Sequence, residues 1–153
     1  VFVFENNGYG EATGHDYAVG SGDIAGRAAG FGLPAVKVDG ADFFAVHEAM
    51  GVAAERARSG QGPSVIEAVA MRWRGHYEGD AMLYRAEGEV AELRANKDPL
   101  QRFLQRVAEQ VAGDDIAAID REVAAAIDEA VERARAANPP AVDQLLTDVY
   151  VSY

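Results

Sequence analysis

Two clusters of polar side chains follow apolar segments of the chain, and they are the places where chemistry could occur. The first cluster is Glu5–Gly10, which reads ENNGYG and comes directly after the apolar run Val1–Phe4. Asn6 and Asn7 offer neutral side-chain oxygens, which are hard ligands suited to magnesium. The glycines leave backbone carbonyls free to turn inward as further oxygen ligands. The same residue types also form ordinary turns, so the residues alone leave a magnesium site and a plain turn open.

The second cluster concentrates basic, acidic and aromatic side chains in one loop. It runs over Arg72–Asp80, which reads RWRGHYEGD, and continues with Tyr84 and Arg85. His76 can donate to a phosphate or move a proton near neutral pH. Arg72 or Arg74 could offset an anion, and Asp80 could pair with Arg85 to order the loop. The alternative is a mobile loop whose charged groups are simply solvated.

Strands and helices in alternating order must position these clusters. The expected strands are Val1–Phe4, Ala35–Val38 and Ser64–Trp73, and the expected helices are Asp23–Phe31 and Phe43–Arg58. Asp42 is placed to cap the second helix, which Ser59-Gly60 ends. This order predicts an α/β fold, with a parallel sheet and helices on both faces. Both clusters then follow strands at the carboxyl edge, where open α/β sheets bind ligands.

The first strand carries a further expectation. Val1–Phe4 is apolar at every position, which is typical of a parallel strand buried on both faces. A chain that begins with Val inside such a strand is expected to be cut from a longer one. The segment 1–86 is therefore expected to be part of an α/β domain, and 87–153 a helical extension and tail.

The second half of the chain changes character. Arg74–Ala86 has no period, and Asp98-Pro99 is a strong helix start. Two apolar stripes follow. The first lies on one helix face and consists of Leu100, Phe103, Leu104, Val107 and Val111, and the second has spacings of three and four and consists of Ile116, Ile119, Val123, Ile127 and Val131. Asn138-Pro139-Pro140 ends the second helix. We expect these helices to form an outer layer packed on the α/β body.

Composition excludes several classes of function. Fourteen Lys and Arg against 25 Asp and Glu give a net charge of −11 in 153 residues, which argues against binding nucleic acid or an anionic membrane surface. An anionic ligand would need a helix N-terminus, an arginine or a metal ion. The chain has no cysteine, which excludes disulfides and thiol chemistry and fits a cytoplasmic protein. No apolar run approaches the length of a membrane span.

A glycine motif matches the pattern of a different class of function. Gly20-x-Gly22-x-x-Ala25 matches a dinucleotide-binding fingerprint, and Asp39 follows at about the expected distance. That fingerprint needs its first glycine directly after a strand, whereas a long polar loop separates Phe4 from Gly20. A dinucleotide-binding oxidoreductase domain is therefore one alternative, and a non-catalytic interaction module is another.

The two clusters together carry a family resemblance. Val1–Gly10 resembles the end of the thiamine diphosphate motif, which opens with Gly-Asp-Gly and closes with Asn-Asn. The chain is similar, in order and spacing, to the alpha subunit of the decarboxylating first component of 2-oxo acid dehydrogenase complexes. The resembling segments are ENNGYG, IAGRAAGFGLPAVKVDGADFFAV, RARSGQGPSVIEAVAMRWRGHYEGD, KDPLQRF and the tail NPPAVDQLLTDVYVSY.

The resemblance implies a fold, cofactors and site residues. The fold would be a partial, parallel-sheet thiamine diphosphate-binding fold with a C-terminal helical extension. The cofactors would be thiamine diphosphate and Mg²⁺, with the Asn7 side chain and the Tyr9 backbone carbonyl as magnesium ligands. His76 would contact the diphosphate and assist acylation of a lipoyl group. An active-site loop that orders when cofactor binds would include Arg72, Asp80, Tyr84 and Arg85.

The resemblance also implies partners and an activity. Such a chain would assemble with a beta subunit as an α2β2 heterotetramer, with the cofactor at the interface and the activating glutamate on the beta subunit. The activity would be cleavage of acetoin or of a 2-oxo acid such as pyruvate, with transfer of the acyl unit to a lipoyl-bearing acyltransferase. A branched-chain 2-oxo acid is the alternative substrate, and the wording GHYEGD favours the acetoin branch.

Three departures from the family pattern affect these expectations. The Gly-Asp-Gly half of the motif is absent from this sequence, and with it the aspartate ligand for Mg²⁺. Tyr77 stands where many alpha subunits carry a phosphorylated serine, so no serine switch is expected there. Asp39–Asp42 reads Asp-Gly-Ala-Asp where the family often has Asp-Gly-Asn-Asp, which removes one side chain from that loop and keeps the cap.

Overall fold

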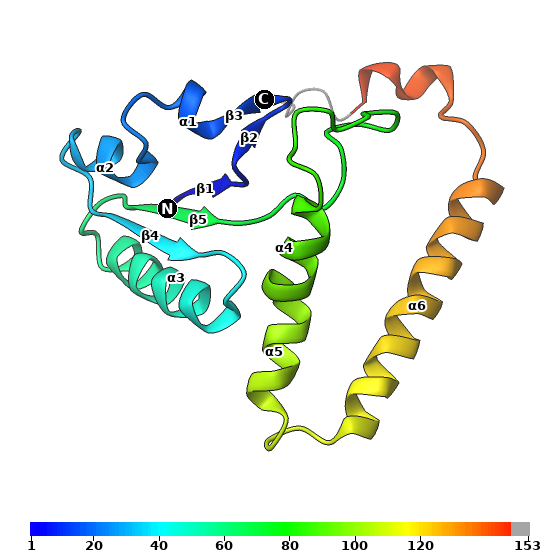
Figure 1. Cartoon of the computed structure of the whole chain (residues 1–153). Helices are drawn as coiled ribbons and strands as arrows, with labels where there is room; N and C mark the ends of the chain where they lie inside the picture. The colour runs from blue at the N-terminus through cyan, green and yellow to red at the C-terminus, as the bar shows by residue number, and fades with distance from the viewer. Residues whose placement is uncertain (148–153) are drawn as a thin grey trace. The chain divides into compact units, whose positions relative to one another are not determined.

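The structure, a computed structural model, describes residues 1–147. Its centre is a three-stranded parallel sheet in the order β1-β5-β4 (Figure 1). These strands are β1 (Phe2–Asn6), β4 (Ala35–Asp39) and β5 (Val65–Val69). The predicted α/β class and the parallel pairing of the three strands are confirmed.

Helices cover both faces of this sheet. Paired residues of parallel strands share a face, so Lys37 and Glu67 lie on one face and Val36 and Ile66 on the other. Helix α2 (Ile24–Ala29) covers the first face, and its side chains enclose an apolar space together with strands β1 and β5. Helix α3 (Phe43–Arg58) covers the second face against β4 and β5. The predicted coverage of both faces is confirmed, as expected for part of a thiamine diphosphate-binding fold.

The first strand is not buried, which corrects the expectation for Val1–Phe4. Phe2, Val3 and Phe4 are 43–55% exposed. The reason is topological, because within residues 1–147 strand β1 pairs with β5 alone and lies at the edge of the sheet. The core lies instead on the central strand β5, where Val65, Ile66 and Ala68 are buried.

Helix α3 begins and ends where the sequence predicts. The Asp42 carboxylate accepts hydrogen bonds from the backbone N–H groups of Phe44 at 2.9 Å and Ala45 at 3.2 Å, which caps the first turn. The helix ends at Arg58, and Gly60 follows with a positive φ of 73°.

Strand β5 is shorter than the expected strand Ser64–Trp73. It ends at Val69, because the last ladder bond runs from the Ala70 N–H to the Asn6 carbonyl, where β1 also ends. The polar loop after β1 also contains elements that the sequence did not predict. They are the hairpin of β2 (Tyr9–Gly10) with β3 (Thr13–Gly14), and helix α1 (His15–Ala18).

Two short helices follow the loop at 74–86. Helix α4 (Glu89–Lys97) was not predicted, whereas α5 (Pro99–Val107) begins at the expected Asp98-Pro99. Asp98 caps α5 by accepting from the Leu100 N–H at 2.9 Å. Phe103 packs on Phe43, with ring centroids 5.2 Å apart, so α5 is anchored where β4 meets α3. The expected stripe residue Val111 lies beyond the end of this helix.

The chain divides into two compact units, Val1–Val107 and Ala108–Tyr153. The second contains α6 (Gly113–Ala136), which ends before Asn138-Pro139-Pro140 as predicted, and the 3-10 helix η1 (Val142–Leu146). The apolar stripe predicted on α6 is present, and Ile119, Val123, Ile127 and Val131 are 41–61% exposed. Packing of this stripe on the α/β body stays a prediction, as does a domain boundary at residue 86. The end of the tail that resembles the family, 148–153, lies outside the described residues.

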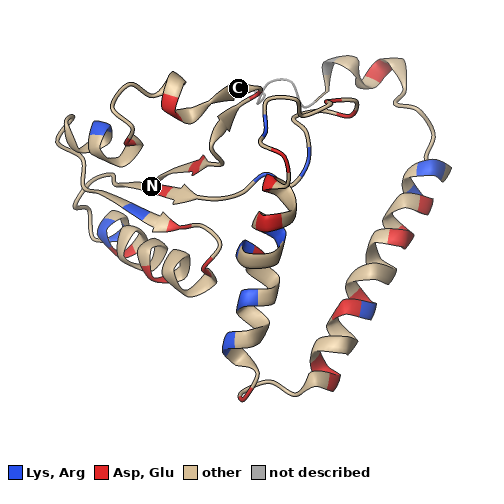
Figure 2. Ribbon diagram, viewed as in Figure 1, with Lys and Arg blue, Asp and Glu red and all other residues tan. Residues whose placement is uncertain are grey.

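Charge is distributed without long stretches of one sign. Acidic and basic residues are interspersed along α4 and α6, whereas α5 carries only the basic residues Arg102 and Arg106 (Figure 2). Within residues 1–147, no helix combines the length and the apolar character needed to cross a lipid bilayer.

Candidate functional site

Both polar clusters meet at the carboxyl edge of the sheet. Strand β1 ends at Asn6 and β5 at Val69, and these two residues pair in the ladder, so the chain leaves both strands at the same point. The loop after β1 and the segment after β5 then touch, because an Arg72 Nη2 donates to the Glu11 carbonyl at 2.8 Å. The structure therefore brings the two clusters together within the first compact unit.

The Asn-Asn pair forms two overlapping turns. The Asn6 Oδ1 accepts from the Gly8 N–H at 3.2 Å, and the Asn7 Oδ1 accepts from the Tyr9 N–H at 3.0 Å. Gly8 has a φ of +84°, which a side chain would strain. Asn7 and Tyr9 thereby line a cavity of about 520 Å³ at the edge of the sheet.

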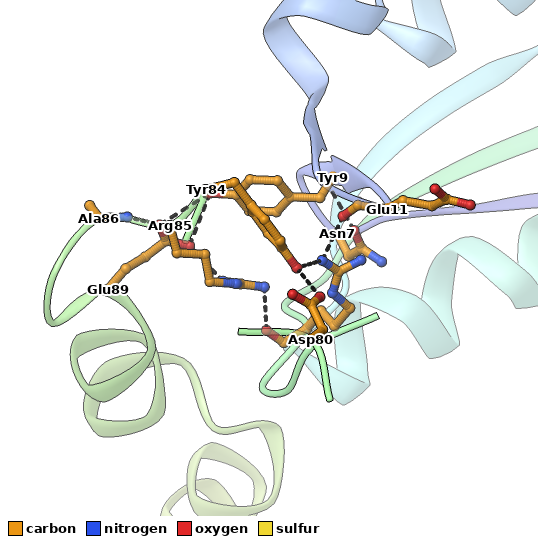
Figure 3. A network of polar contacts seen from close by, with 9 residues as sticks. Asn7, Tyr9, Glu11, Asp80, Tyr84, Arg85, Ala86 and Glu89 are labelled. Carbon is orange, nitrogen blue, oxygen red and sulfur yellow. Dashed lines mark hydrogen bonds and ion pairs between the residues drawn. The ribbon is translucent and has the colours of Figure 1, made fainter. Parts of the chain in front are cut away.

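Tyr9 is held by the second cluster on several sides (Figure 3). The Arg85 guanidinium lies 4.7 Å from its ring centroid, and the Tyr84 ring lies 5.3 Å away. The Tyr9 hydroxyl donates to Glu89 Oε2 at 3.1 Å. Burial and the neighbouring Glu89 carboxylate raise the pKa of Tyr9, so its hydroxyl remains a donor.

The expected pair between Asp80 and Arg85 is wrong. Arg85 instead forms an ion pair with Glu89, whose Oε1 lies 2.6 Å from its Nη1, and donates from Nη2 to the Arg72 carbonyl at 2.7 Å. The Arg85 side chain is only 4% exposed. Glu89 lies four residues beyond Arg85, at the start of α4, within easy reach of the guanidinium.

Asp80 binds its own loop. Its Oδ2 accepts from the Tyr84 hydroxyl at 2.7 Å and the His76 N–H at 2.8 Å, and its Oδ1 accepts from the Met82 N–H at 2.8 Å. The Tyr84 hydroxyl, these two N–H groups and the charge of Arg72 lower the pKa of Asp80 to about 2. A Cβ on Gly75 would lie 2.5 Å from the Asp80 Cβ, so the loop can close only with glycine there.

His76 and Asn7 line different cavities. The His76 side chain is 50% exposed, and its Nε2 lies 3.9 Å from Glu11 Oε1. It opens into a space of about 440 Å³, which it shares with Glu11, Tyr77 and Asp80. The structure thus gives His76 an accessible imidazole, and it does not bring His76 and Asn7 into one cavity.

The chemistry of the available donors fits part of a magnesium site. Mg²⁺ takes six oxygen ligands and retains several waters. The Asn7 Oδ1 has a second lone pair beyond its bond to Tyr9 N–H, and the Tyr9 carbonyl would supply another neutral oxygen. No group of three His, Cys, Asp or Glu residues in the described part of the chain could hold a metal ion. Asn7 and Tyr9 therefore fit two positions of a site that other groups complete.

The residues that the sequence interpretation missed are charged ones beneath and beside this turn. Glu67 is completely buried, and its Oε1 lies 3.5 Å from the Lys37 Nζ. The signal was present, because VIEAV and AVKV each carry one charge at the middle of an apolar strand, at paired positions of the ladder. Glu89 could have been found from its spacing of four from Arg85.

The glycines of the dinucleotide fingerprint do not follow a strand. Gly20 comes after helix α1, and the Asp39 carboxylate is bound by Arg102 Nη1 at 2.8 Å. Burial alone would raise the pKa of Asp39, but Arg102 and the Ala41 N–H outweigh it and hold the pKa below its ordinary value. The geometry required for binding a pyrophosphate in a tight β–α turn is therefore not met by this motif.

Comparison with known proteins adds an independent finding. Residues 1–143 match the family model for the dehydrogenase E1 component. The alpha subunit of acetoin:2,6-dichlorophenolindophenol oxidoreductase from Cupriavidus necator is 54% identical over 155 residues, and the match covers 100% of this chain and 46% of the relative. The protein of the same name from Bacillus subtilis is 44% identical, with the same coverage. The alpha subunit of the pyruvate dehydrogenase E1 component from Rhizobium meliloti is 34% identical over 151 residues, covering 97% of this chain and 43% of the relative. The chain therefore spans less than half the length of these relatives.

Proposed function

The chain belongs to the dehydrogenase E1 component family, and on that premise we propose that it is part of an alpha subunit that uses thiamine diphosphate and Mg²⁺ to cleave acetoin. The acyl unit then passes to the lipoyl group of a partner acyltransferase. The observation that best supports acetoin as the substrate is the 54% identity to an acetoin oxidoreductase alpha subunit over the whole of this chain. Pyruvate is the second candidate substrate, supported by 34% identity to a pyruvate dehydrogenase alpha subunit.

The turn after β1 would hold the cofactor. The Asn7 side chain and the Tyr9 carbonyl would bind Mg²⁺, and the metal would offset the repulsion between the diphosphate and this acidic chain. The Arg85, Tyr84 and Glu89 contacts to the Tyr9 side chain fix the turn without occupying its backbone carbonyl. When bound, thiamine diphosphate supplies the electron sink for carbon–carbon cleavage.

His76 is proposed to assist acyl transfer and, once its loop orders around the cofactor, to donate to the diphosphate that Asn7 holds through Mg²⁺; this needs a movement of the loop, because His76 and Asn7 line different cavities here. Its imidazole is half-exposed in the cavity beside Tyr77, so a group carried by a partner protein could reach it. Its backbone N–H is fixed by Asp80, which limits the positions that the ring can take. A histidine can hold or release a proton near neutral pH, as transfer to a thiol group requires.

The partners follow from the same premise. We propose assembly with a beta subunit as an α2β2 heterotetramer, because both acetoin relatives are named as alpha subunits. The missing magnesium ligands and the activating glutamate would come from groups outside residues 1–147. A cytoplasmic location, the absence of a serine switch at Tyr77, and no role with nucleic acid or membranes stay predictions.

The experiment uses the full-length protein co-produced with its beta subunit. Acetoin, pyruvate and a branched-chain 2-oxo acid are compared as substrates with 2,6-dichlorophenolindophenol as electron acceptor. We expect acetoin to give the largest kcat/KM, and calorimetry to show thiamine diphosphate binding only with Mg²⁺. Binding of NAD without binding of thiamine diphosphate would favour the dinucleotide alternative and contradict the proposal, and binding of neither would favour an interaction module.

Two variants then test the roles of single residues. Asn7→Ala should weaken Mg²⁺-dependent cofactor binding about 10- to 100-fold, with exposed Asn96→Ala on α4 as the matched control. His76→Ala should slow lipoyl acylation about 100-fold or more while cofactor affinity changes much less. If Asn7→Ala binds the cofactor with the affinity of the wild type, Asn7 is not a ligand. If His76→Ala acylates the lipoyl group at the wild-type rate, His76 has no role in the transfer.

A further inference from the structure

A carboxylate lies buried in the sheet directly beneath the cofactor-binding turn. Glu67 is the middle residue of the central strand β5, and it has no exposed surface. A buried charge is strongly unfavourable unless it is paired and hydrogen-bonded. Each group that donates a hydrogen bond or a positive charge to this carboxylate is therefore held in a fixed position by it.

Three elements supply the partners of Glu67. Its Oε1 accepts from the Asn6 Nδ2 of β1 at 2.8 Å and lies 3.5 Å from the Lys37 Nζ of β4. Its Oε2 accepts from the Ala25 N–H in the first turn of α2 at 2.8 Å. Burial alone would raise the pKa of Glu67, but these hydrogen bonds and the Lys37 charge outweigh it, and the pKa lies below its ordinary value.

The charge of Glu67 determines which way the Asn6 amide points. An ionised carboxylate only accepts hydrogen bonds, so the Asn6 amide must turn its NH₂ toward Glu67. The Asn6 Oδ1 then faces the opposite way and accepts from the Gly8 N–H at 3.2 Å. This bond closes the first of the two turns that present Asn7 and Tyr9.

We infer that Glu67 is a positioning residue, whose buried carboxylate orients the Asn6 amide and thereby the turn that carries Asn7 and Tyr9. The inference rests on the proposed function for what the turn binds, although the orientation of the turn is a property of this chain alone. Glu67 lies beneath the backbone of the turn and would act on Mg²⁺ and cofactor through Asn6 only.

Two single substitutions break this arrangement in opposite ways. Asn6→Asp places a second carboxylate against Glu67 with no proton between them, and the two charges repel. Glu67→Gln must keep its carbonyl oxygen for the Ala25 N–H, so its NH₂ meets the NH₂ of Asn6. In the full-length protein with its beta subunit, each variant should weaken Mg²⁺-dependent thiamine diphosphate binding about 10- to 100-fold.

The double variant Asn6→Asp with Glu67→Gln should restore binding. The NH₂ of the introduced glutamine would donate to one oxygen of the introduced aspartate, and the other oxygen would accept from the Gly8 N–H. This re-forms the bonds of residue 6 to residue 67 and to Gly8, with the donor between residues 6 and 67 reversed, whereas the contact of Lys37 with residue 67 is lost. We expect the cofactor affinity of the double variant to lie within about threefold of the wild type. The effects of the two substitutions would then be strongly non-additive, which is not seen for residues that do not touch. A double variant no better than the weaker single one would overturn the inference.

Hydrogen exchange without cofactor separates this inference from the proposed function. Exchange at the Gly8 N–H should speed up in both single variants and return in the double variant, with Asn96→Asp plus Glu122→Gln as the exposed control pair. Unchanged exchange in the single variants would overturn the inference whatever the protein binds. If exchange responds as expected but wild type binds no thiamine diphosphate, the proposed function fails and the positioning role of Glu67 stands.

Discussion

Two carboxylates organise the candidate site, and they do so in different ways. Glu67 is completely buried and binds residues 42 and 61 positions away in the sequence, from α2 and β1. Asp80 lies in a surface loop, and its partners His76, Met82 and Tyr84 are two to four positions away. The buried group therefore ties separate elements of the fold together, whereas the surface group closes one loop.

Removal of the buried carboxylate should have the largest effect. Glu67→Ala leaves the Asn6 amide and the Ala25 N–H without a partner and leaves Lys37 without its counter-charge. Breaking a buried ion pair costs about 3–5 kcal/mol, and because Lys37 is partly exposed we expect about 3 kcal/mol here. Urea unfolding of the full-length protein measures this loss, with Glu122→Ala on α6 as the control. A loss below about 1 kcal/mol would show that Glu67 does not tie these elements together.

The link between the two regions should rank second. Arg85→Met keeps most of the apolar stem but removes the bonds to Glu89 and the Arg72 carbonyl and the contact with the Tyr9 ring. We expect about 2 kcal/mol of lost stability, because the partly buried Glu89 carboxylate loses its cation. The same unfolding experiment measures it, with the exposed Arg121→Met as a matched variant. An effect equal to that of Arg121→Met would mean that Arg85 does not hold the turn.

The surface loop should respond to acid by itself. The pKa of Asp80 is lowered to about 2, so its ionised form favours the closed loop above its ordinary pKa, near 4, and this contribution is lost as the pH falls toward 2. Hydrogen-exchange protection factors over residues 75–85, which correct for the intrinsic pH dependence of amide exchange, should therefore fall between about pH 4 and pH 2. Asp80→Asn should show low protection factors across that range and no such transition. A transition of equal size in Asp80→Asn would assign it to another group.

An exposed ion pair on α6 should have the smallest effect on stability among these substitutions. Arg135 Nη1 lies 2.8 Å from Glu132 Oε1 on α6, and both side chains are largely exposed. Arg135→Ala should change stability by less than about 0.5 kcal/mol, because solvent screens such pairs. Thermal unfolding measures the change, and a loss approaching that of Arg85→Met would show that burial does not determine how much an ion pair of this chain contributes to stability.

The sequence predicted the strands of the sheet, the helices α2 and α3 and the start of α5, because local signals determine them, and it missed the short elements β2, β3, α1 and α4. The cap at Asp42, the Asp98-Pro99 helix start and the three apolar segments at 1–4, 35–38 and 64–73 each encode an element without knowledge of the rest. The exposure of β1 could not be predicted in this way. Whether a strand lies at an edge depends on the strand order, and three apolar segments are compatible with several orders.

The site was predictable in its location but not in its contacts. Asn6 and the loop at 72–85 were placed at the right edge because parallel strands end together. The pairing of Arg85 with Glu89 rather than Asp80 depends on a helix at 89–97 that has no strong start signal, since a glycine stands at its N-cap and no side chain caps it. The single charges in VIEAV and AVKV were visible in the sequence, but the pairing of Lys37 with Glu67 required the register of the strands.

The exposed first strand has a practical consequence for anyone who prepares this chain. Strand β1 carries Phe2, Val3 and Phe4 with both faces accessible, and a sheet edge of this kind templates pairing with another copy. A preparation limited to these 153 residues would therefore tend to aggregate as its concentration rises. Val3→Lys, on the face away from Glu67, would place a charge on this edge and oppose such pairing without touching the site.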